Sequence, residues 1–360
     1  MGALLGEELT SPGSGATHPL FLSVIVTAYR RRTFLREAVR SILAQDLERS
    51  EFEVIVLKDF ADAELDEEFA AESPTVRVHT EDLARMGEMI AKGVELARGK
   101  VVCFLEDDDR FRPGKLRGLR ELFRRSTDLG FVRNSYEGID VEGRPLASWE
   151  QLRPQPPRSV RLSPEARGPA GLGFLFRYGV HINLSTMAIR RDLARPWLDL
   201  LREVPASPDV FVFLLAAVGG RPMLVEASRW NDYRVHASTS HAALTEGNEA
   251  KDLADTIRSD TAARVMELVL AQARGHVLAE RFVACFHREV TATQYLLDPA
   301  ARWSVGGWFG FVRTALWRRQ RYLGALAAFA VYRAVSPSRA IRAYRRWRFR
   351  ALRSAAGASN

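Results

Sequence analysis

The stretch FLSVIVTAYRRRTFLREAVRSILAQ, residues 21–45, decides the fold class. It opens on an apolar run with β-branched side chains, which is typical of a strand buried on both faces. Its second half places Leu35, Val39 and Ile42 on one helical face, with Thr33 as the expected helix cap. A buried strand that leads directly into an amphipathic helix is the first half of a strand–helix–strand unit.

The same pattern recurs further along the chain. It predicts a second buried strand at 52–57, a helix at 84–98 and a third strand at 101–105. Gly99 is expected to end the helix as a left-handed C-cap. Strand, helix, strand, helix, strand is the signature of a parallel sheet with crossover helices, so we predict an α/β fold with a mostly parallel sheet flanked by helices.

The pattern fails between residues 150 and 180, where prolines and glycines without periodicity predict a long loop or lid. Regular structure is expected to resume with a strand near 183–189, a helix near 208–218, a strand near 223–227, and helices over 249–297 interrupted at Gly275. We therefore divide the chain into a disordered leader at 1–19, an α/β domain at 20–245 and a helical, basic C-terminal region at 246–360.

The composition is that of an ordinary globular protein, with 47% hydrophobic and 27% charged residues among 360. Two cysteines exclude a disulfide framework and a Cys-rich zinc module, and they suit a reducing compartment. No apolar stretch is long enough to span a membrane, and the N-terminus lacks the apolar core of a signal peptide. We expect a cytoplasmic protein.

The net charge of +8 comes from the C-terminal region. No acid follows Asp298, whereas thirteen arginines do, so the rest of the chain carries a net charge of −5. Arginines interleaved with aromatic residues over 302–352 favour an anionic membrane surface as partner and a peripheral place on its inner face. Packing of these helices on the α/β domain is the alternative. Nucleic acid is not expected, because the body of the protein is negative.

The strongest local signal is the run Glu106-Asp107-Asp108-Asp109, which directly follows the third predicted strand. In an open parallel sheet, ligands bind beyond the carboxyl ends of the strands. Four adjacent carboxylates repel one another unless they share a cation, and Mg²⁺ or Mn²⁺ takes one or two carboxylates together with phosphate oxygens. The alternative is a solvated acidic turn.

Two further strand ends point to the same edge. Tyr29 and the arginines 30–32 follow the first strand, and Lys58 and Asp59 follow the second. A flat ring, a carboxylate and a metal-holding acid cluster suit a nucleoside diphosphate. Taken singly these signals are weak. Tyr29 is as readily a core residue as a ligand-binding one, and the arginines also fit the exposed start of a helix.

The chain resembles family 2 glycosyltransferases, which are inverting enzymes of GT-A fold that use nucleotide sugars. The resemblance covers roughly residues 20–245. The matching stretches are SVIVTAYRRRTFLREAVRSILAQ at 23–45, FEVIVLKDF at 52–60, GVELARGKVVCFLEDDDRF at 93–111, PDVFVFLLAAVGG at 208–220 and YRVHASTS at 233–240.

The resemblance implies roles for the residues at the strand ends. Thr27 and Tyr29 would border the nucleotide base, and Asp59 would bind its edge. Glu106 or Asp107 would reach the ribose. Arg30 and Lys58 differ from the residues that the family commonly has at these positions, so the identity of the nucleotide stays open.

The resemblance also implies the catalytic groups. Asp108 matches the metal ligand, His236 matches a histidine near the diphosphate or metal, and Asp209 matches the catalytic base. From the residues alone, Asp209 in the run Ser207-Pro208-Asp209 also fits an N-terminal helix cap, and His236 fits a hydrogen-bonded structural histidine equally well.

We therefore expect transfer of a sugar from a nucleotide-diphosphate donor, most simply a UDP-sugar, to a hydroxyl of a glycan or lipid-linked acceptor. The mechanism is a single displacement assisted by Mn²⁺ or Mg²⁺. The alternatives are a polyprenyl-phosphate glycosyltransferase and a sugar-nucleotide-binding protein without turnover.

Overall fold

The computed structural model describes residues 20–29, 31–73, 75–83, 85–146, 154–164, 169–205, 207–236, 264–297 and 321–355, together with 261, 304, 306 and 308–309. The predicted leader at 1–19 lies outside them, as do Arg30, residues 237–260 and most of 298–320. The boundary expected near residue 245 therefore falls outside the described residues.

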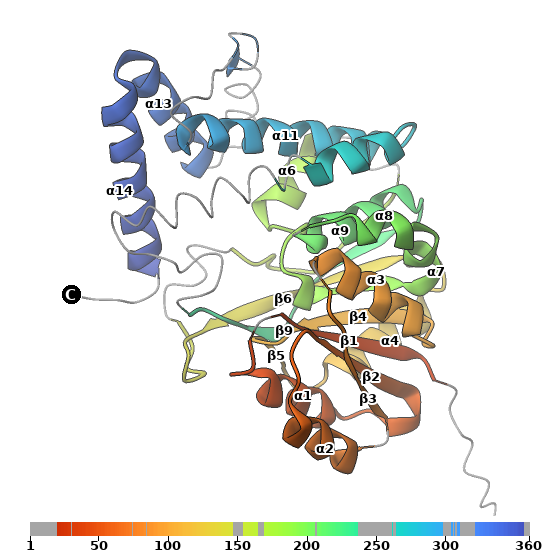
Figure 1. Ribbon diagram of the computed structural model, residues 1–360. Helices are drawn as coiled ribbons and strands as arrows, with labels where there is room; N and C mark the ends of the chain where they lie inside the picture. Colours follow the sequence, from red (N-terminus) through yellow and green to blue (C-terminus); the bar gives the residue numbers. More distant parts are fainter. Residues whose placement is uncertain are drawn as a thin grey trace, which may run out of the picture.

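The described residues form a curled central sheet flanked by helices (Figure 1). The strands are β1 (Leu22–Ala28), β2 (Phe52–Lys58), β3 (Val76–Thr80), β4 (Val101–Glu106), β5 (Arg110–Phe111), β6 (Phe131–Ile139), β7 (Val160–Leu162), β8 (Met187–Arg190) and β9 (Met223–Arg234). The helices are α1 (Leu35–Leu43), α2 (Ala63–Glu72), α3 (Met86–Leu96), α4 (Lys115–Arg125), α6 (Pro169–Arg177), α7 (Arg191–Ala194), α8 (Leu198–Arg202), α9 (Pro208–Val218), α11 (Val277–Leu297), α13 (Arg321–Val335) and α14 (Pro337–Ala355). Short 3₁₀ turns are η1 (Arg49–Glu51), η2 (Leu184–Thr186) and η3 (Arg195–Trp197).

The sheet is parallel in its first half and mixed in its second. The strand order is β3-β2-β1-β4-β8-β6-β9-β5, with β7 paired to β9. β3, β2, β1 and β4 run parallel, β8 runs antiparallel to both β4 and β6, and β9 runs parallel to β6. This order confirms the predicted α/β fold and brings the carboxyl ends of β1, β2 and β4 to one edge.

The alternation along β1 shows why helices cover both faces of the sheet. Val24 and Val26 belong to the core that contains Leu35 of α1, whereas Ile25 belongs to the core that contains Met89 of α3. Figure 1 shows α3, α8 and α9 on one side of the sheet and α1 and α2 on the other. Each fully buried side chain of this kind stabilises the fold by roughly 1.5–3 kcal/mol.

Two local expectations about helix ends are wrong. Helix α1 begins at Leu35, and no side-chain cap precedes it, so Thr33 is not its cap. Helix α3 ends at Leu96, and Gly99 does not have the left-handed backbone of a C-cap. A Cβ atom at Gly99 would lie 2.7 Å from the backbone of Leu22. Gly99 is therefore required by the close approach of the chain to β1.

The expectation of a structureless loop at 150–180 is also wrong in part. Strand β7 and helix α6 form within it, although residues 151–153 and 165–168 lie outside the described residues. The apolar run Leu172–Phe176 supplies the buried face of α6, and its Leu175 is fully buried. Helix α2 and strand β3, which the sequence analysis did not predict, fill the interval between β2 and α3.

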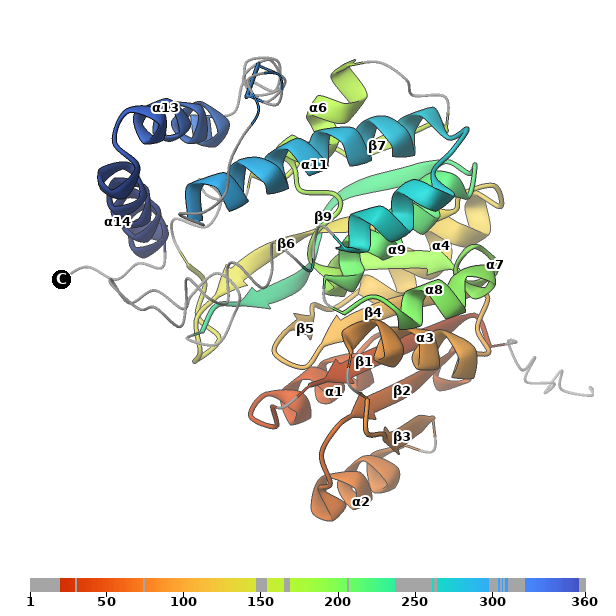
Figure 2. The same cartoon turned by 45° about the horizontal axis from the view of Figure 1, so that its top comes forward.

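Of the C-terminal helices, α11 packs on the α/β domain through aromatic side chains. Phe282 of α11 stacks on Phe176 of α6 with ring centroids 4.9 Å apart, and it lies 4.7 Å from the ring of Phe213 in α9. Figure 2 shows α13 and α14 as a pair beyond one end of α11. The Arg333 guanidinium of α13 lies 3.9 Å from the centre of the Tyr295 ring in α11. None of the helices among the described residues has both the length and the apolarity that crossing a membrane requires.

Candidate active site

The four acids lie at the carboxyl edge of the sheet, next to the end of β1. Glu106 is the last residue of β4 and pairs in register with Thr27 of β1. The amide of Asp107 donates to the Thr27 carbonyl at 3.0 Å, and the amide of Asp109 donates to the Glu106 carbonyl at 3.1 Å. These bonds fold the acids into a tight turn instead of a solvated one, and Asp107 and Asp109 are buried.

The guanidinium of Arg31 occupies the centre of this cluster. Its Nε and Nη2 atoms donate to the two carboxylate oxygens of Asp107 at 2.6 and 2.7 Å. Nη2 also lies 2.7 Å from Oδ2 of Asp108, and Nη1 lies 3.1 Å from Nε2 of His236. One arginine therefore contacts two of the predicted acids and the predicted histidine.

The end of β9 brings His236 to the same place. Its Nε2 lies 3.0 Å from Oδ2 of Asp108, and its ring lies 5.4 Å from that of Phe34. Two residues earlier, the amide of Arg234 donates to Asp109 at 3.0 Å. The predicted juxtaposition of Asp108 and His236 is thus present in the structure.

Asp209 is tied to the acid cluster through one short turn. The amide of Asn183 donates to Oδ2 of Asp209 at 3.0 Å. Two residues later, the hydroxyl of Ser185 accepts the amide of Glu106 at 3.0 Å. Since consecutive Cα atoms are about 3.8 Å apart, the Cα atoms of Asn183 and Ser185 are at most about 7 Å apart, and the two acids contact this one short segment.

Asp209 is the second residue of α9 and not its cap. The cap position belongs to Ser207, whose side chain makes no capping hydrogen bond. Burial raises the pKa of Asp209 to about 6, although hydrogen bonds from the backbone amides of Val210 and Asn183 oppose the shift. A carboxyl group with that pKa is mostly ionised at neutral pH and can accept a proton.

Burial also raises the pKa values of the cluster itself. The pKa of Asp107 is raised to about 6 by burial, even though its hydrogen bonds from Arg31 oppose the shift. The pKa of Glu106 is raised well above its ordinary value by burial and then by the charges of Asp108, Asp109 and Asp209. A cation brought to this edge would therefore favour the ionised form of these carboxyl groups.

A buried lysine supports the turn that joins the two halves of the site. The ammonium of Lys115 donates to the Ser185 carbonyl and to Oδ1 of Asn231, each at 2.7 Å. The amide nitrogen of the Asn231 side chain also donates to the Ser185 carbonyl, at 2.9 Å. Burial lowers the pKa of Lys115 to about 7. These bonds hold Ser185, and with it Asn183 and Glu106, in place.

The residues expected to face the nucleotide lie at neighbouring strand ends. Thr27 is buried at the end of β1, and Tyr29 is half-buried against the core under α3. Asp59 is half-buried, and its amide lies 3.4 Å from the Ala28 carbonyl. Lys58 is turned away from this edge, since its buried ammonium lies 3.1 Å from Asp66 of α2. The structure thus places Thr27, Tyr29 and Asp59 beside one another.

The donor atoms at the cluster suit a hard divalent cation. Carboxylate oxygens and an imidazole nitrogen are ligands of Mn²⁺ and Mg²⁺. Among the described residues, however, no three acidic, histidine or cysteine side chains are arranged as a metal site. The guanidinium of Arg31 lies where Asp107, Asp108 and His236 converge.

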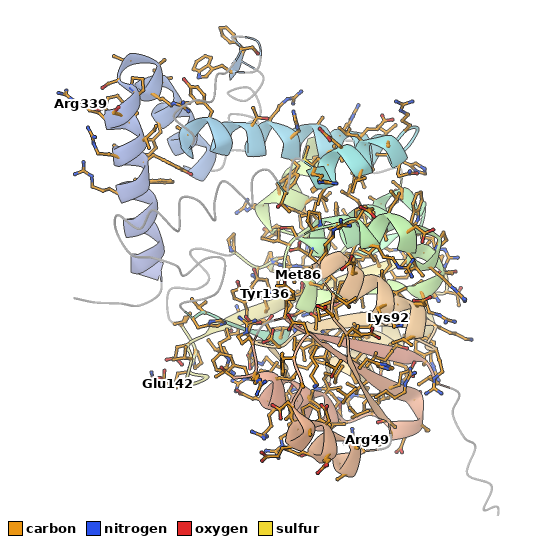
Figure 3. The ribbon with its side chains drawn as sticks, viewed as in Figure 1. Arg49, Met86, Lys92, Tyr136, Glu142 and Arg339 are labelled. Carbon is orange, nitrogen blue, oxygen red and sulfur yellow. The ribbon has the colours of Figure 1, made fainter. Side chains whose placement is uncertain are left out.

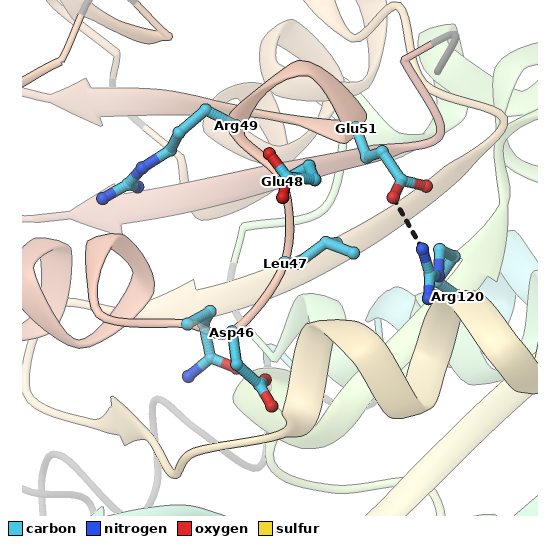
Figure 4. Close-up of a pocket in the computed structure, with 7 residues that line it drawn as sticks. Asp46, Leu47, Glu48, Arg49, Glu51 and Arg120 are labelled. Atoms are coloured by element: carbon cyan, nitrogen blue, oxygen red, sulfur yellow. Dashed lines mark hydrogen bonds and ion pairs between the residues drawn. The ribbon is translucent and has the colours of Figure 1, made fainter. Parts of the chain in front are cut away.

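A separate hollow of about 450 Å³ lies at the opposite edge of the sheet, beside η1 (Figure 4). Its lining comprises residues 45–49, Glu51 and Arg120. Glu51 is buried and paired with Arg120 at 2.6 Å and with Arg124 at 3.0 Å. Because its buried charge is neutralised within the protein, we do not assign a function to this hollow.

Four contributors were not assigned roles in the sequence analysis: Arg31, Lys115, Asn183 and Ser185. For Arg31 the sequence did offer a hint, because it is one of three consecutive arginines that follow the first predicted strand. It is half-buried, whereas its neighbour Arg32 is exposed, so the expectation of exposed arginines holds for Arg32 and not for Arg31, while Arg30 lies outside the described residues. The other three are polar residues without a local motif, and their partners lie 70 or more residues away in the case of Lys115 and Ser185.

Comparison with known proteins gives consistent results. Residues 23–185 match the family described as Glycosyl transferase family 2. An uncharacterized glycosyltransferase of Rickettsia bellii (strain RML369-C) is 31% identical over 129 residues, which are 35% of this chain and 18% of that protein. The chain thus matches about a fifth of that relative's length.

Two solved structures share the fold. S. aureus TarS 1-349 in complex with UDP-GlcNAc aligns with a TM-score of 0.54 at 13% identity, over 90% of each chain. The mannosyltransferase PcManGT from Pyrobaculum calidifontis, in complex with GDP-Man and Mn²⁺, aligns with a TM-score of 0.51 at 13% identity, over 92% of this chain and 88% of that one. At such identities the likeness establishes the fold.

Proposed function

Because residues 23–185 belong to glycosyltransferase family 2 and the sheet has the GT-A fold of its structural neighbours, we propose that the protein transfers a sugar from a nucleotide-diphosphate donor to an acceptor hydroxyl with inversion. The observation that carries this proposal is the turn that ties Asp209 to Glu106 through Asn183 and Ser185. A base and a donor-binding acid cluster are thereby held on either side of one short segment.

The donor is bound at the carboxyl ends of β1, β2 and β4. Tyr29 borders the base with Thr27, Asp59 accepts hydrogen bonds from its edge, and Glu106 or Asp107 reaches the ribose. We favour a UDP-sugar, which is supported by the likeness to TarS in complex with UDP-GlcNAc. The complex of PcManGT with GDP-Man makes a guanine nucleotide the alternative.

Asp209 is the general base of this proposal. The acceptor hydroxyl has a pKa far above 7, so its proton must be taken as the new bond forms, and a positioned base contributes about 10²–10⁴-fold to the rate. Backbone amides of Asn183 and Val210 fix the carboxylate by hydrogen bonds of 3.0 and 2.9 Å. They orient the base and leave it ionised at neutral pH.

Asp108 and His236 would hold the divalent cation, Mn²⁺ or Mg²⁺, with Asp107 beside them. When bound, that cation stabilises the negative charge on the departing diphosphate as a Lewis acid. The likeness to PcManGT in complex with Mn²⁺ supports this assignment. The protein's own part is to hold the carboxylates close together through the Asp107–Thr27 and Asp109–Glu106 backbone bonds.

A hydroxyl of a glycan or a lipid-linked glycan is the acceptor that the site favours. A polyprenyl phosphate is already anionic and needs no base, whereas the proposed role of Asp209 is that of a base. Asp209→Asn separates the two: we expect near-complete loss of transfer for a hydroxyl acceptor, while substantial residual activity would indicate a phosphate acceptor.

A donor screen tests the enzymatic proposal itself. Release of nucleoside diphosphate is measured for a panel of UDP- and GDP-sugars with Mn²⁺, using the wild type, Asp108→Asn and Asp209→Asn. The exposed Asp199→Asn serves as the control. We expect release from one donor class, loss in both site variants and no loss in the control. A donor-dependent rise in melting temperature without any release would instead indicate a binding protein.

We further propose that α13 and α14 place the protein on the inner, cytoplasmic face of an anionic membrane. Arg339, Arg342 and Arg346 are exposed at helical spacing on α14, and Val331 and Val335 are exposed on α13. Figure 3 shows Arg339 on the side of α14 that faces away from the α/β domain. Exposed apolar side chains next to arginines suit the boundary between headgroups and acyl chains.

Vesicle co-sedimentation tests the membrane proposal. We expect binding to vesicles that contain phosphatidylglycerol and weak binding to pure phosphatidylcholine. Replacing Arg339, Arg342 and Arg346 by Ser should weaken binding strongly, since each arginine contributes roughly 1 kcal/mol near anionic lipid. Arg117→Ser, on the exposed face of α4, is the control. Equal binding of both variants would refute the assignment.

A further inference from the structure

Arg31 uses the contacts that a divalent cation would need. Its guanidinium is 2.6 and 2.7 Å from the oxygens of Asp107, 2.7 Å from Asp108 and 3.1 Å from His236. A guanidinium is charged at every pH that a folded protein tolerates, so this is a permanent positive charge. A metal ion and Arg31 cannot occupy the same place, because both need the same oxygen and nitrogen atoms.

Two further cations near the cluster, Lys115 and Arg234, bind other groups. Lys115 is buried and donates to Ser185 and Asn231. The guanidinium of Arg234 is buried, donates to the carbonyls of Asp108, Asp140 and Val141, and pairs with Glu37 at 2.6 Å. Both contribute structural bonds that a ligand cannot replace without unpacking the fold. Arg31 alone, among these three, binds the carboxylates of Asp107 and Asp108 directly.

Arg31 is also placed so that it can leave. It lies between β1 and α1, outside helix and strand, and its side chain is 23% exposed. No sheet or helix hydrogen bond is lost if it swings outward. Arginine forms bidentate hydrogen bonds with phosphate as readily as with carboxylate, so an arriving diphosphate offers the displaced guanidinium an alternative partner.

We propose that Arg31 is a resident cation that holds the acid cluster together without metal and gives way to the divalent cation when a nucleotide sugar binds. The inference rests on the proposed metal-assisted transfer and adds the order in which metal and donor bind. In this order the free protein binds metal weakly, and donor and metal bind together, with Arg31 moving onto the diphosphate.

The test measures Mn²⁺ binding by electron paramagnetic resonance, without nucleotide and with UDP or GDP. The wild type is compared with Arg31→Gln and with Arg32→Gln, which removes the adjacent exposed charge without touching the cluster. We expect Arg31→Gln to bind Mn²⁺ without nucleotide at least about tenfold more tightly than the wild type, because the competing cation is gone. Arg32→Gln should match the wild type.

The second readout is the factor by which bound nucleotide raises the affinity for Mn²⁺. Such factors are typically about 5–150-fold. We expect a larger factor in the wild type than in Arg31→Gln, since only the wild type must displace its own cation. Arg31→Lys keeps the charge without the forked geometry and should remain closer to the wild type, which controls for a folding defect in Arg31→Gln.

Unchanged or weaker Mn²⁺ binding by Arg31→Gln would overturn the inference. That result would leave the proposed transfer intact, because the donor screen reads sugar release directly. Conversely, tighter Mn²⁺ binding by Arg31→Gln supports the inference even if no donor in the panel is turned over.

Discussion

Replacing Asp209 by Asn should stabilise the protein at neutral pH while it removes the proposed base. The pKa of Asp209 is about 6 in the folded protein against an ordinary value of 3.8, so folding raises it by roughly two units. Each unit is worth about 1.4 kcal/mol, which sets an upper limit of about 3 kcal/mol on the cost of keeping this carboxylate ionised. Burial is the cause of that cost.

The substitution also removes one hydrogen-bond acceptor. Asp209 accepts the amides of Asn183 and Val210 on its two oxygens, whereas Asn has a single acceptor oxygen. Losing one such bond costs about 1 kcal/mol. The expected net gain in the free energy of unfolding is therefore about 1–2 kcal/mol at pH 7.5.

The direction of the pKa shift fixes how the stability difference between Asp209→Asn and the wild type changes with pH. Because the folded pKa lies above the unfolded one, the wild type carries the cost above pH 6 and is relieved of it as the pH falls towards 4. The gain in the free energy of unfolding from Asp209→Asn should thus reach its maximum by pH 7.5 and should be mostly lost near pH 4. Urea unfolding followed by tryptophan fluorescence at both pH values measures it.

Asp199→Asn is the matched control for this experiment. Its side chain is fully exposed, so its replacement should change the free energy of unfolding by less than about 0.5 kcal/mol. An Asp209→Asn protein that is less stable than the wild type at pH 7.5, or an advantage that persists unchanged at pH 4, would refute the reasoning.

Three further predictions concern the base, the buried lysine and the glycine beside β1. The rate of transfer, measured as kcat/KM against pH, should fall below about pH 6, because Asp209 must be ionised to accept a proton; a flat profile down to pH 5 would contradict its role. Lys115→Met should lower the free energy of unfolding by about 1–3 kcal/mol in urea titrations, since it removes one of the two donors to the Ser185 carbonyl and one of the two donors to Oδ1 of Asn231; an unchanged midpoint would show that the lysine holds nothing in place. Gly99→Ala should lower the thermal midpoint, because its Cβ would lie 2.7 Å from the backbone of β1; equal midpoints would mean that the strand shifts freely.

The fold could be predicted from the sequence where periodicity was strong. The helix expected at 208–218 matches α9, where eight consecutive buried apolar residues, Val210–Ala217, leave little ambiguity. The strand expected at 101–105 matches β4, whose first five residues are all buried. Gly99 was misassigned because a glycine after a helix usually reports a local turn. Here a neighbouring strand, which lies far away in the sequence, requires the missing side chain.

The acids of the candidate site could be found from the sequence, but the way they are neutralised could not. Four acids after a buried strand form a local pattern, and parallel strands place their carboxyl ends together. By contrast, Arg31 meets Asp107 across 76 residues and His236 across 205. Such a contact depends on the strand order and on the side-chain direction, and neither has a local signature.

The central claim is that the carboxylates around Asp108 hold a cation that binds the diphosphate of a nucleotide sugar, with Asp209 facing the sugar. A crystal structure with Mn²⁺ and the donor found in the screen tests it most directly. We predict Mn²⁺ between Asp108 and the diphosphate, the base beside Tyr29 and Asp59, and Asp209 on the side of the sugar opposite the leaving group. A donor bound elsewhere, with Asp108 turned away from both metal and phosphate, would contradict the claim.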